Sequence, residues 1–296
     1  AFIRKGPNAK LLKAEKTKAL AGFIRGIQRI GGFGGKSDLL ATCQTYTGNP
    51  GCYRENARYL DEVTPAKMKA TFAEWIDDTP YVLTILPNEK LGVNDTGVDR
   101  SSGVPYPTEK VSFKFPTLQT ATLSNGAKVV LAQRTGVPLV ELNFQFSFGY
   151  AQENNNELGY TNFMMDMLNE GTKKYSSLQF DEALDSLGSN LWLGSGLDTS
   201  YASVSTLKAN LSQTLDLAKE ALIFPTFPQN EIDRIKKQTL ASIIQEENRP
   251  AAIAYRNIGK LLYGENHPYG KPLTGRRKKK TISNINRNDV IAVHNR

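Results

Sequence analysis

Histidine and cysteine are scarce in this chain, with two of each among 296 residues. The histidines, His267 and His294, lie in YGENHPYG and near the C-terminal end. A catalytic zinc site usually takes imidazole or thiolate ligands with at most one carboxylate, and serine catalysis needs a histidine base. There is no Gly-x-Ser-x-Gly motif, and a cysteine nucleophile would need a histidine to reach it across a long polar segment. The scarcity argues against triad chemistry and against a complete zinc site.

Long hydrophobic runs are also missing. The longest, such as KVVLA, break after a few positions, whereas a membrane helix needs about 18 apolar residues. Residues 1–30 carry interspersed cations and lack the apolar centre and cleavage site of a signal peptide. We expect a soluble protein without a membrane span, and we interpret Ala1 as a cut or processed end of a longer protein.

Positive charge is in excess, with 37 Lys and Arg against 29 Asp and Glu and a formal net charge of +8. Much of the excess lies in residues 1–36 and in RRKKK at 276–280. This balance permits attraction to acidic peptides, anionic lipid or nucleic acid. Runs of cations are typical of solvated loops, and no aromatic residues are interleaved here as a single-strand binder requires. An anion or nucleic-acid binder acting through RRKKK stays an alternative, and nucleic acid is disfavoured as a partner.

The two cysteines, Cys43 and Cys52, flank QTYTGNPG. A turn built on GNPG would bring them together. The pair is therefore either a disulfide or two free buried thiols, and two cysteines do not settle the compartment.

The glycine-rich stretch IGGFGGKSD at 30–38 matches most of the sequence motif of a phosphate-binding loop. That motif needs a glycine where Ile30 stands, and it must follow a strand, whereas FIRGIQRI favours a helix. A flexible turn between two helices accounts for the glycines.

Composition divides the chain into three parts. Residues 1–86 favour helices and close with the β-prone YVLTILP. One helix there starts at Thr64 and Pro65, and its expected apolar stripe is Met68, Phe72, Trp75 and Ile76. Residues 87–112 are polar and broken by Gly and Pro, which predicts an interdomain linker. Residues 113–296 alternate strand and helix patterns, which predicts one further domain.

The strand patterns in residues 113–296 predict an antiparallel sheet packed against helices. Asn125 and Gly126, between two β-prone arms, are the favoured two-residue hairpin signal. VELNFQFSFG at 140–149 alternates strictly, so we expect it to cover a core on one side only. LWLGSGLDTSYASVSTL favours one or two strands around GSG. With the helical patterns that follow, the fold class is α+β.

The helix expected after Gly159 carries Asn162 and Asp166 one turn apart on its inward face. Such a pair would hold a metal if both residues were good ligands. Glu246 and Glu247 lie further along the chain. A set of Asn, Asp and Glu suits weak binding of Mg²⁺ or Ca²⁺ and does not make a zinc site that acidifies water.

These segments resemble the pitrilysin/insulinase family of zinc metallopeptidases, which includes the mitochondrial processing peptidases. LSNG at 123–126 matches the family's hairpin turn, and the stretch from Gly159 to Thr172 resembles the helix that carries His-x-x-Glu-His. Downstream, SLGSNLWLGSGLDTSYASVS is similar to its edge strand, FPTFPQNEIDRIKKQTLASIIQEENRP to its ligand-bearing helix, and LYGENHPYGKPLTG to its Pro-Tyr-Gly segment. The resemblance covers residues 112–296, and GGFGGKSDLL to YVLTILP resembles the end of a preceding family domain.

The chain departs from the family at each chemical position of the motif. Asn162 stands where the first histidine would, Met165 where the general base would, and Asp166 where the second histidine would. Glu246, or its neighbour Glu247, falls near the third ligand. The resemblance therefore implies a degenerate zinc motif, no metal or cofactor in this chain, and zinc in an upstream catalytic half.

The family's second half is commonly inactive and closes over the active half to form a chamber for extended peptides. By resemblance, residues 1–86 are the C-terminal part of a preceding domain, 87–112 the hinge strap, and 113–296 a domain truncated at its C-terminal end. The parent would be a zinc metalloendopeptidase, this chain would be inactive, and its partner would be the upstream catalytic half or a separate subunit. An inactive scaffold or interaction subunit of the same fold is the second hypothesis.

Peptides of this family bind by adding a strand to a sheet edge. Residues 191–206 correspond to that edge, with Leu193, Gly194, Ser195 and Gly196 as candidate contacts. An edge covered by neighbouring loops is an equal alternative. The polar linker and a disulfide between the cysteines would fit a periplasmic or secreted protein.

Overall fold

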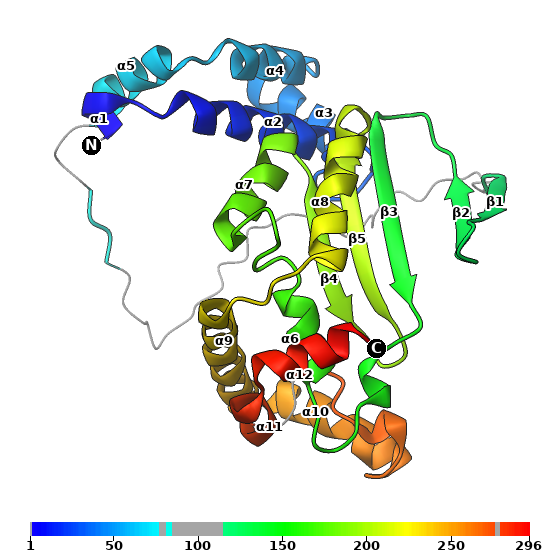
Figure 1. Cartoon of the computed structure of the whole chain (residues 1–296). Coiled ribbons are helices and arrows are strands. Elements are labelled where there is room, and N and C mark those ends of the chain that lie inside the picture. The colour runs from blue at the N-terminus through cyan, green and yellow to red at the C-terminus, as the bar shows by residue number, and fades with distance from the viewer. Residues whose placement is uncertain (1, 77–80, 85–114, 276–278) are drawn as a thin grey trace, which may run out of the picture.

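The structure is a computed structural model that describes residues 2–76, 81–84, 115–275 and 279–296. The expected linker at 87–112 lies outside these residues, so the division into domains stays a prediction. None of the helices in the described ranges combines the length and the apolar character that crossing a bilayer demands. The α+β class with antiparallel strands and packed helices is confirmed (Figure 1).

The N-terminal part consists of helices. They are α1 (Phe2–Lys5), α2 (Ala9–Gly26), α3 (Lys36–Thr47), α4 (Cys52–Glu62) and α5 (Pro65–Trp75). The glycine-rich stretch at 31–35 is the turn between α2 and α3. Cys43 and Cys52 form a disulfide that joins α3 to α4. Thr64 caps α5 by accepting a hydrogen bond from the backbone N–H of Lys67 at 3.2 Å.

One expectation for this part is met only in part, and another is wrong. Of the apolar stripe predicted for α5, Met68 and Phe72 are half-buried, whereas Trp75 is 78% exposed. Residues 81–84, at the start of the predicted strand YVLTILP, have no regular structure, and Tyr81 is 89% exposed. Strand propensity alone does not form a strand, because the backbone groups need a partner strand.

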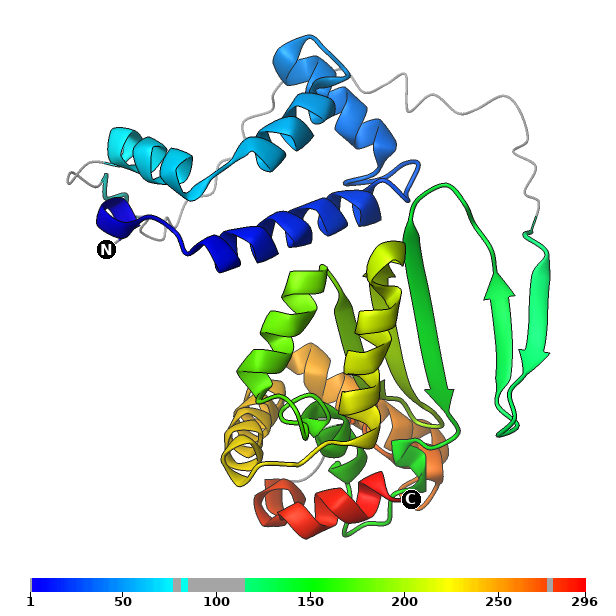
Figure 2. The ribbon, with the colours of Figure 1, turned by 45° about the horizontal axis from the view of Figure 1, so that its top comes forward.

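Strands β3 (Leu139–Phe146), β5 (Ser200–Leu207) and β4 (Asn190–Ser195) form an antiparallel sheet in that order. The register places Val140, Leu142 and Phe144 opposite three fully buried residues of β5, Thr206, Val204 and Ala202. Directly opposed side chains share a face. The predicted alternation is therefore met at Val140 and Leu142, which are half-buried, whereas Phe144 and Phe146 of the same face are exposed. Helices α6 (Tyr160–Met167), α7 (Ser177–Leu187) and α8 (Leu211–Ile223) lie over that face (Figures 1 and 2).

The hairpin of β1 (Leu118–Thr122) and β2 (Lys128–Ala132) stands apart from the larger sheet (Figure 2). Its loop differs from the two-residue loop predicted from Asn125 and Gly126. The N–H of Gly126 donates to the carbonyl of Leu123 at 2.9 Å, and the N–H of Leu123 donates to the carbonyl of Ala127 at 2.9 Å. Gly126 has φ +84°, so the loop has three residues with glycine in the left-handed position.

Two clusters of buried side chains form the core. The larger joins α6 to α9 (Gln229–Glu247) and α12 (Arg287–His294), with Phe227 and Ile285 between them. The smaller joins Phe180 and Leu184 of α7 to Leu217 and Ala221 of α8. The remaining elements are α10 (Pro250–Tyr263), α11 (Lys279–Asn284) and three short 3-10 helices, η1 (Tyr150–Gln152), η2 (Lys208–Asn210) and η3 (Pro268–Gly270).

Helix α2 docks on the end of α7 (Figure 2). Lys18 pairs with Asp185 at 3.1 Å, and the guanidinium of Arg25 donates to the carbonyl of Gly188 at 2.5 Å and to the hydroxyl of Ser205 at 2.8 Å. A Cβ at Gly188 would lie 2.8 Å from the Cβ of Ala21, so only glycine lets the two segments approach so closely. The N-terminal helices are thus held against the α+β part.

We predict that Phe180→Ala lowers the free energy of unfolding by about 3–5 kcal/mol, because the ring is fully buried between α7 and α8. Leu178→Ala is the matched control on the same helix, since Leu178 is 69% exposed, and it should change the value by less than about 0.5 kcal/mol. Urea unfolding followed by circular dichroism measures both. Equal losses for the two variants would contradict this packing.

Candidate functional site

Helix α6 is the element on which the sequence places the degenerate motif, and a buried carboxylate fixes its start. Gly159 precedes the helix with φ +97°. Glu153, only 4% exposed, accepts hydrogen bonds from the backbone N–H groups of Gly159 at 2.8 Å and Thr161 at 2.7 Å. A negative charge at a helix N-terminus satisfies free N–H groups and complements the helix dipole.

The segment that carries Glu153 is itself tied to the region after α10. The Lys271 ammonium donates to the backbone carbonyls of Ala151, at 2.6 Å, and of Glu153. The Tyr150 hydroxyl donates to the carbonyl of Leu273 at 3.1 Å, and the Thr281 hydroxyl to that of Leu158 at 2.8 Å. Residues 150–158, which precede α6, are therefore held in place by hydrogen bonds to residues 271–281, more than 100 positions further along the chain.

The predicted inward orientation of Asn162 and Asp166 is wrong. Asp166 is exposed and Asn162 is half-buried, with its amide donating to the carbonyl of Gly275 at 3.3 Å. The inward face carries the larger core instead, including Phe163, Met165 and Met167. Met165 is 3% exposed. The position assigned to the general base is thus a core position filled by a thioether, which cannot take a proton from water.

The two glutamates near the expected third ligand are engaged with cations. Glu246 pairs with Arg256 of α10 at 2.7 Å, and Glu247 pairs with Lys279 at 2.5 Å. Within the ranges that the structure describes, no three His, Cys, Asp or Glu side chains gather as ligands for a metal ion. Asn162, Met165, Asp166 and Glu246 do not fit zinc, because they provide neither imidazole nor thiolate.

The cationic run RRKKK lies partly outside the described residues, which resume at Lys279. Lys279 is engaged with α9 through Glu247. The use of this run for anion binding stays a prediction.

Of the residues 191–206 proposed as a peptide-binding edge, only the first part lies on an outer strand of the sheet, and peptide binding there stays a prediction. β4 is an outer strand of the sheet, whereas β5 is the central strand and has no free edge. Leu193, Gly194 and Ser195 lie on β4. Gly196 lies beyond it, and its backbone is occupied: its carbonyl accepts from the N–H of Tyr150 at 3.0 Å, and its own N–H donates to the carbonyl of Thr199 at 2.7 Å.

The two faces of β4 differ. Leu193 packs against the larger core, while Trp192 is 50% exposed on the opposite face. Among the described strands, β4 pairs with β5 alone, so its second edge carries no strand. Such an edge can accept an extended segment through backbone hydrogen bonds.

Sequence patterns missed Glu153 and Lys271. Glu153 lies in the polar stretch AQENNNELG, six residues before the N-cap glycine, and outside any capping motif. Lys271 lies in PYGKPL, where nothing indicates a partner so far away. Only the approach of the two segments in space gives these residues their roles.

Comparisons with known proteins agree with this geometry. The model of the insulinase family, peptidase family M16, matches residues 128–276. The solved structure of a peptidase M16 inactive domain from Pseudomonas fluorescens aligns with a TM-score of 0.57 and 29% identity, over 60% of this chain and 43% of that chain.

Two curated bacterial proteins are similar in sequence. One is named non-peptidase homolog YmxG, from Helicobacter pylori, with 26% identity over 182 residues, which cover 60% of this chain and 41% of that protein. The other is named uncharacterized zinc protease YmxG, from Bacillus subtilis, with 27% identity over 167 residues, 56% of this chain and 40% of that protein. The chain thus spans less than half the length of these relatives.

We predict that Glu153→Gln lowers the free energy of unfolding by about 1–3 kcal/mol, because the amide replaces one buried acceptor with a donor facing an N–H group. Glu15→Gln, an exposed carboxylate on α2, is the matched control and should have an effect below about 0.5 kcal/mol. Thermal or urea unfolding measures both. An unchanged stability of Glu153→Gln would mean that the carboxylate does not hold the start of α6.

Proposed function

The chain belongs to the insulinase family of peptidases, M16, and from this premise we propose that it is a non-catalytic part of a zinc metalloendopeptidase. The observation that carries the proposal is the burial of Met165, the residue that the resemblance aligns with the general base, which is 3% exposed in the core. The engagement of Glu246 with Arg256 also supports it, because a carboxylate paired with a guanidinium is a poor metal ligand. Zinc and peptide cleavage then reside in another half of the protein or in a partner subunit.

The chain's role in the assembly would be to form a wall of the substrate chamber. The second edge of β4, at Leu193 to Ser195, would take an extended peptide as an added strand. Backbone hydrogen bonds along such an edge tolerate many sequences, which suits a chamber that accepts varied peptides.

We place the protein in the periplasm or outside the cell. The disulfide between Cys43 and Cys52 supports this location, because disulfides persist in oxidising compartments and are rare in the cytosol.

We predict that zinc is absent from this chain and present at about one equivalent in the full-length gene product, since the chain contributes none of the imidazoles that bind zinc in such sites. Elemental analysis of both proteins after dialysis against metal-free buffer measures the bound zinc. Zinc at one equivalent on the chain itself would mean that the ligands lie elsewhere in it. Its absence from both proteins would favour an inactive scaffold of the same fold.

An engineered variant serves as the positive control for that measurement. Asn162→His combined with Asp166→His places two imidazoles one turn apart on α6. The double variant should take up zinc, and Asn162→His alone should take up much less. No difference between them would contradict the assignment of these positions to the zinc motif.

We predict that an extended neutral peptide crosslinks to the β4 edge. A benzophenone side chain in place of Trp192 should label the peptide several-fold more than one in place of Leu178, which is at least as exposed but lies on α7. Mass spectrometry after irradiation measures the labelling. Equal labelling at the two positions would remove the support for peptide binding at β4 while leaving the zinc assignment untouched.

A further inference from the structure

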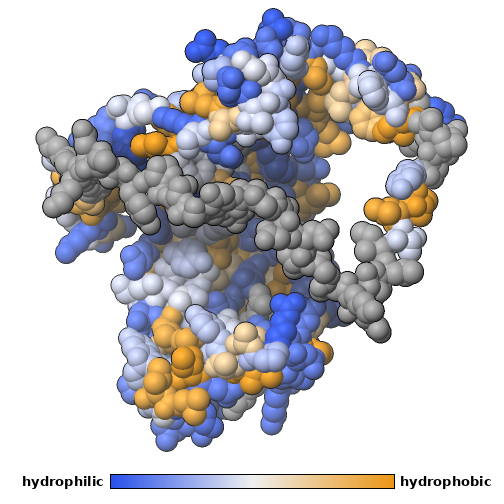
Figure 3. Space-filling view, turned by 180° about the vertical axis from the view of Figure 1, so that it is seen from behind, coloured by the Kyte–Doolittle hydropathy of each residue, from blue (hydrophilic) through white to orange (hydrophobic). Residues whose placement is uncertain are grey.

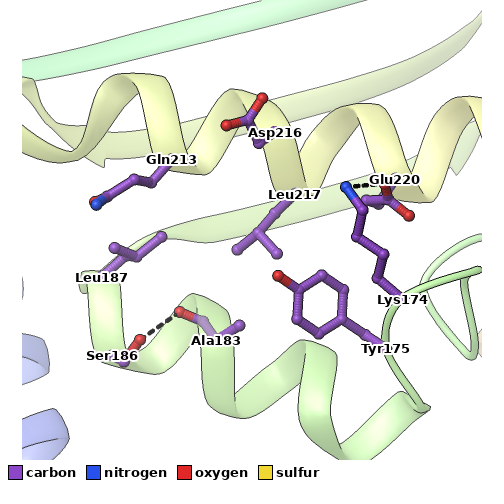
Figure 4. Close-up of a pocket in the computed structure, with 9 residues that line it drawn as sticks. All are labelled: Lys174, Tyr175, Ala183, Ser186, Leu187, Gln213, Asp216, Leu217 and Glu220. Carbon is purple, nitrogen blue, oxygen red and sulfur yellow. Dashed lines mark hydrogen bonds and ion pairs between the residues drawn. The ribbon is translucent and has the colours of Figure 1, made fainter.

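A cavity of about 220 Å³ lies between α7 and α8 (Figure 4). Apolar side chains from both helices form its wall, and polar side chains lie around them. The lining residues are Lys174, Tyr175, Ala183, Ser186, Leu187, Gln213, Asp216, Leu217 and Glu220. None of them belongs to α6 or β4, so the cavity is separate from the site already described.

Glu220 is the unusual member of this lining. The residue is 5% exposed, and its Oε1 is held by the Lys174 ammonium at 2.9 Å. Its Oε2 is buried and has no hydrogen-bond partner within the described part of the chain. Buried polar atoms are satisfied as a rule, and a carboxylate oxygen without a donor calls for one.

Buried hydroxyls in the same region obey that rule. Ser189, Thr206 and Thr214 bond to one another at 2.7 to 2.9 Å. Among the described residues, the Thr161 hydroxyl and the Glu220 carboxylate have buried oxygens without a partner, and of the two only Glu220 lines the cavity.

The Lys174 ammonium, which pairs with Glu220, can be displaced by the cation of a ligand. The Lys174 side chain is 68% exposed, so its ammonium stays hydrated and can move away without being newly desolvated. The hydrogen bond to Glu220 raises the pKa of Lys174, with Asp216 adding a smaller attraction. The carboxylates of Glu220 and Asp216 are one turn apart on α8 and outnumber the single cation of the lining.

The rest of the lining suits an aliphatic stem. Leu187 and Leu217 project into the space between the helices, and the Tyr175 hydroxyl points toward Leu217 (Figure 4). The Ser186 hydroxyl is turned back to the carbonyl of Ala183 at 2.8 Å. A chain of methylene groups would lie on the leucines with its charged end at Glu220.

We propose that this cavity binds an alkylammonium or alkylguanidinium group, with Glu220 as its anionic partner and Leu187 and Leu217 as the wall for the stem. The group comes either from a lysine or arginine side chain of a peptide or from a free amine. Lys174 holds the carboxylate until the ligand replaces it. The proposal does not depend on peptide binding at β4.

The test is a titration of the whole chain with small-molecule probes, in which ¹H–¹⁵N NMR spectra are recorded at each probe concentration. The probes are Nα-acetyl-lysine methylamide, Nα-acetyl-arginine methylamide and butylamine, and the uncharged control is Nα-acetyl-norleucine methylamide. We expect saturable shifts at cavity residues with the cationic probes and none with norleucine. Tighter binding of the amino-acid amides than of butylamine identifies a peptide side chain as the source. Equal binding identifies a free amine.

Variants separate the cavity from unspecific attraction. Glu220→Gln should weaken binding about tenfold or more, because it removes the charge that faces the cation. Glu182→Gln, an exposed carboxylate of α7 outside the lining, should leave binding unchanged. Lys174→Met should tighten binding, because it removes the internal competitor.

Shifts of equal size with norleucine would overturn the proposal, as would unchanged binding in a folded Glu220→Gln variant. If Glu220→Gln does not fold, Lys174→Met decides: binding no tighter than that of the unmodified chain then overturns the proposal.

Discussion

The carboxylate of Glu153, buried at the start of α6, is the contact on which the α+β part depends. It satisfies two backbone N–H groups that the helix itself leaves open, and the segment that carries it is held by Lys271 from the region after α10. With its start fixed, α6 directs Phe163, Met165 and Met167 into the core shared with α9 and α12. The sheet, the helices above it and the C-terminal helices meet around this one element.

The packing around α6 explains how the chain keeps the fold of the family although α6 carries no histidine. Helix α6 is held by the burial of its large side chains, a stabilisation that does not depend on metal binding. Met165, at the position that the resemblance assigns to the general base, adds apolar area to the core instead of a carboxylate that could take a proton from water. Arg256 of α10 and Lys279 of α11 form ion pairs with Glu246 and Glu247 of α9. The glutamates expected near the third metal ligand therefore connect helices.

Several features were predictable from sequence because they depend on neighbours along the chain. The cap at Thr64 and the alternation at Val140 and Leu142 follow from local hydrogen bonding and side-chain periodicity. The hairpin at Asn125 and Gly126 was predicted in place but not in loop length, since the signal does not specify which residue takes the left-handed conformation. The first four residues of the expected strand YVLTILP, 81–84, are not a strand, and none of the described strands pairs with them.

The amino-acid sequence by itself determined the fold class, the family frame and the scarcity of imidazole ligands, because these depend on residue type and on spacing along the chain. The tertiary structure alone decided that Asp166 faces outward, that β5 is a central strand and β4 an outer one, and that Glu220 lines a cavity with one oxygen unsatisfied. Those properties depend on which distant segments meet. The type of a residue determines which hydrogen bonds and ion pairs its side chain can form. The tertiary packing determines which partners lie close enough to form them.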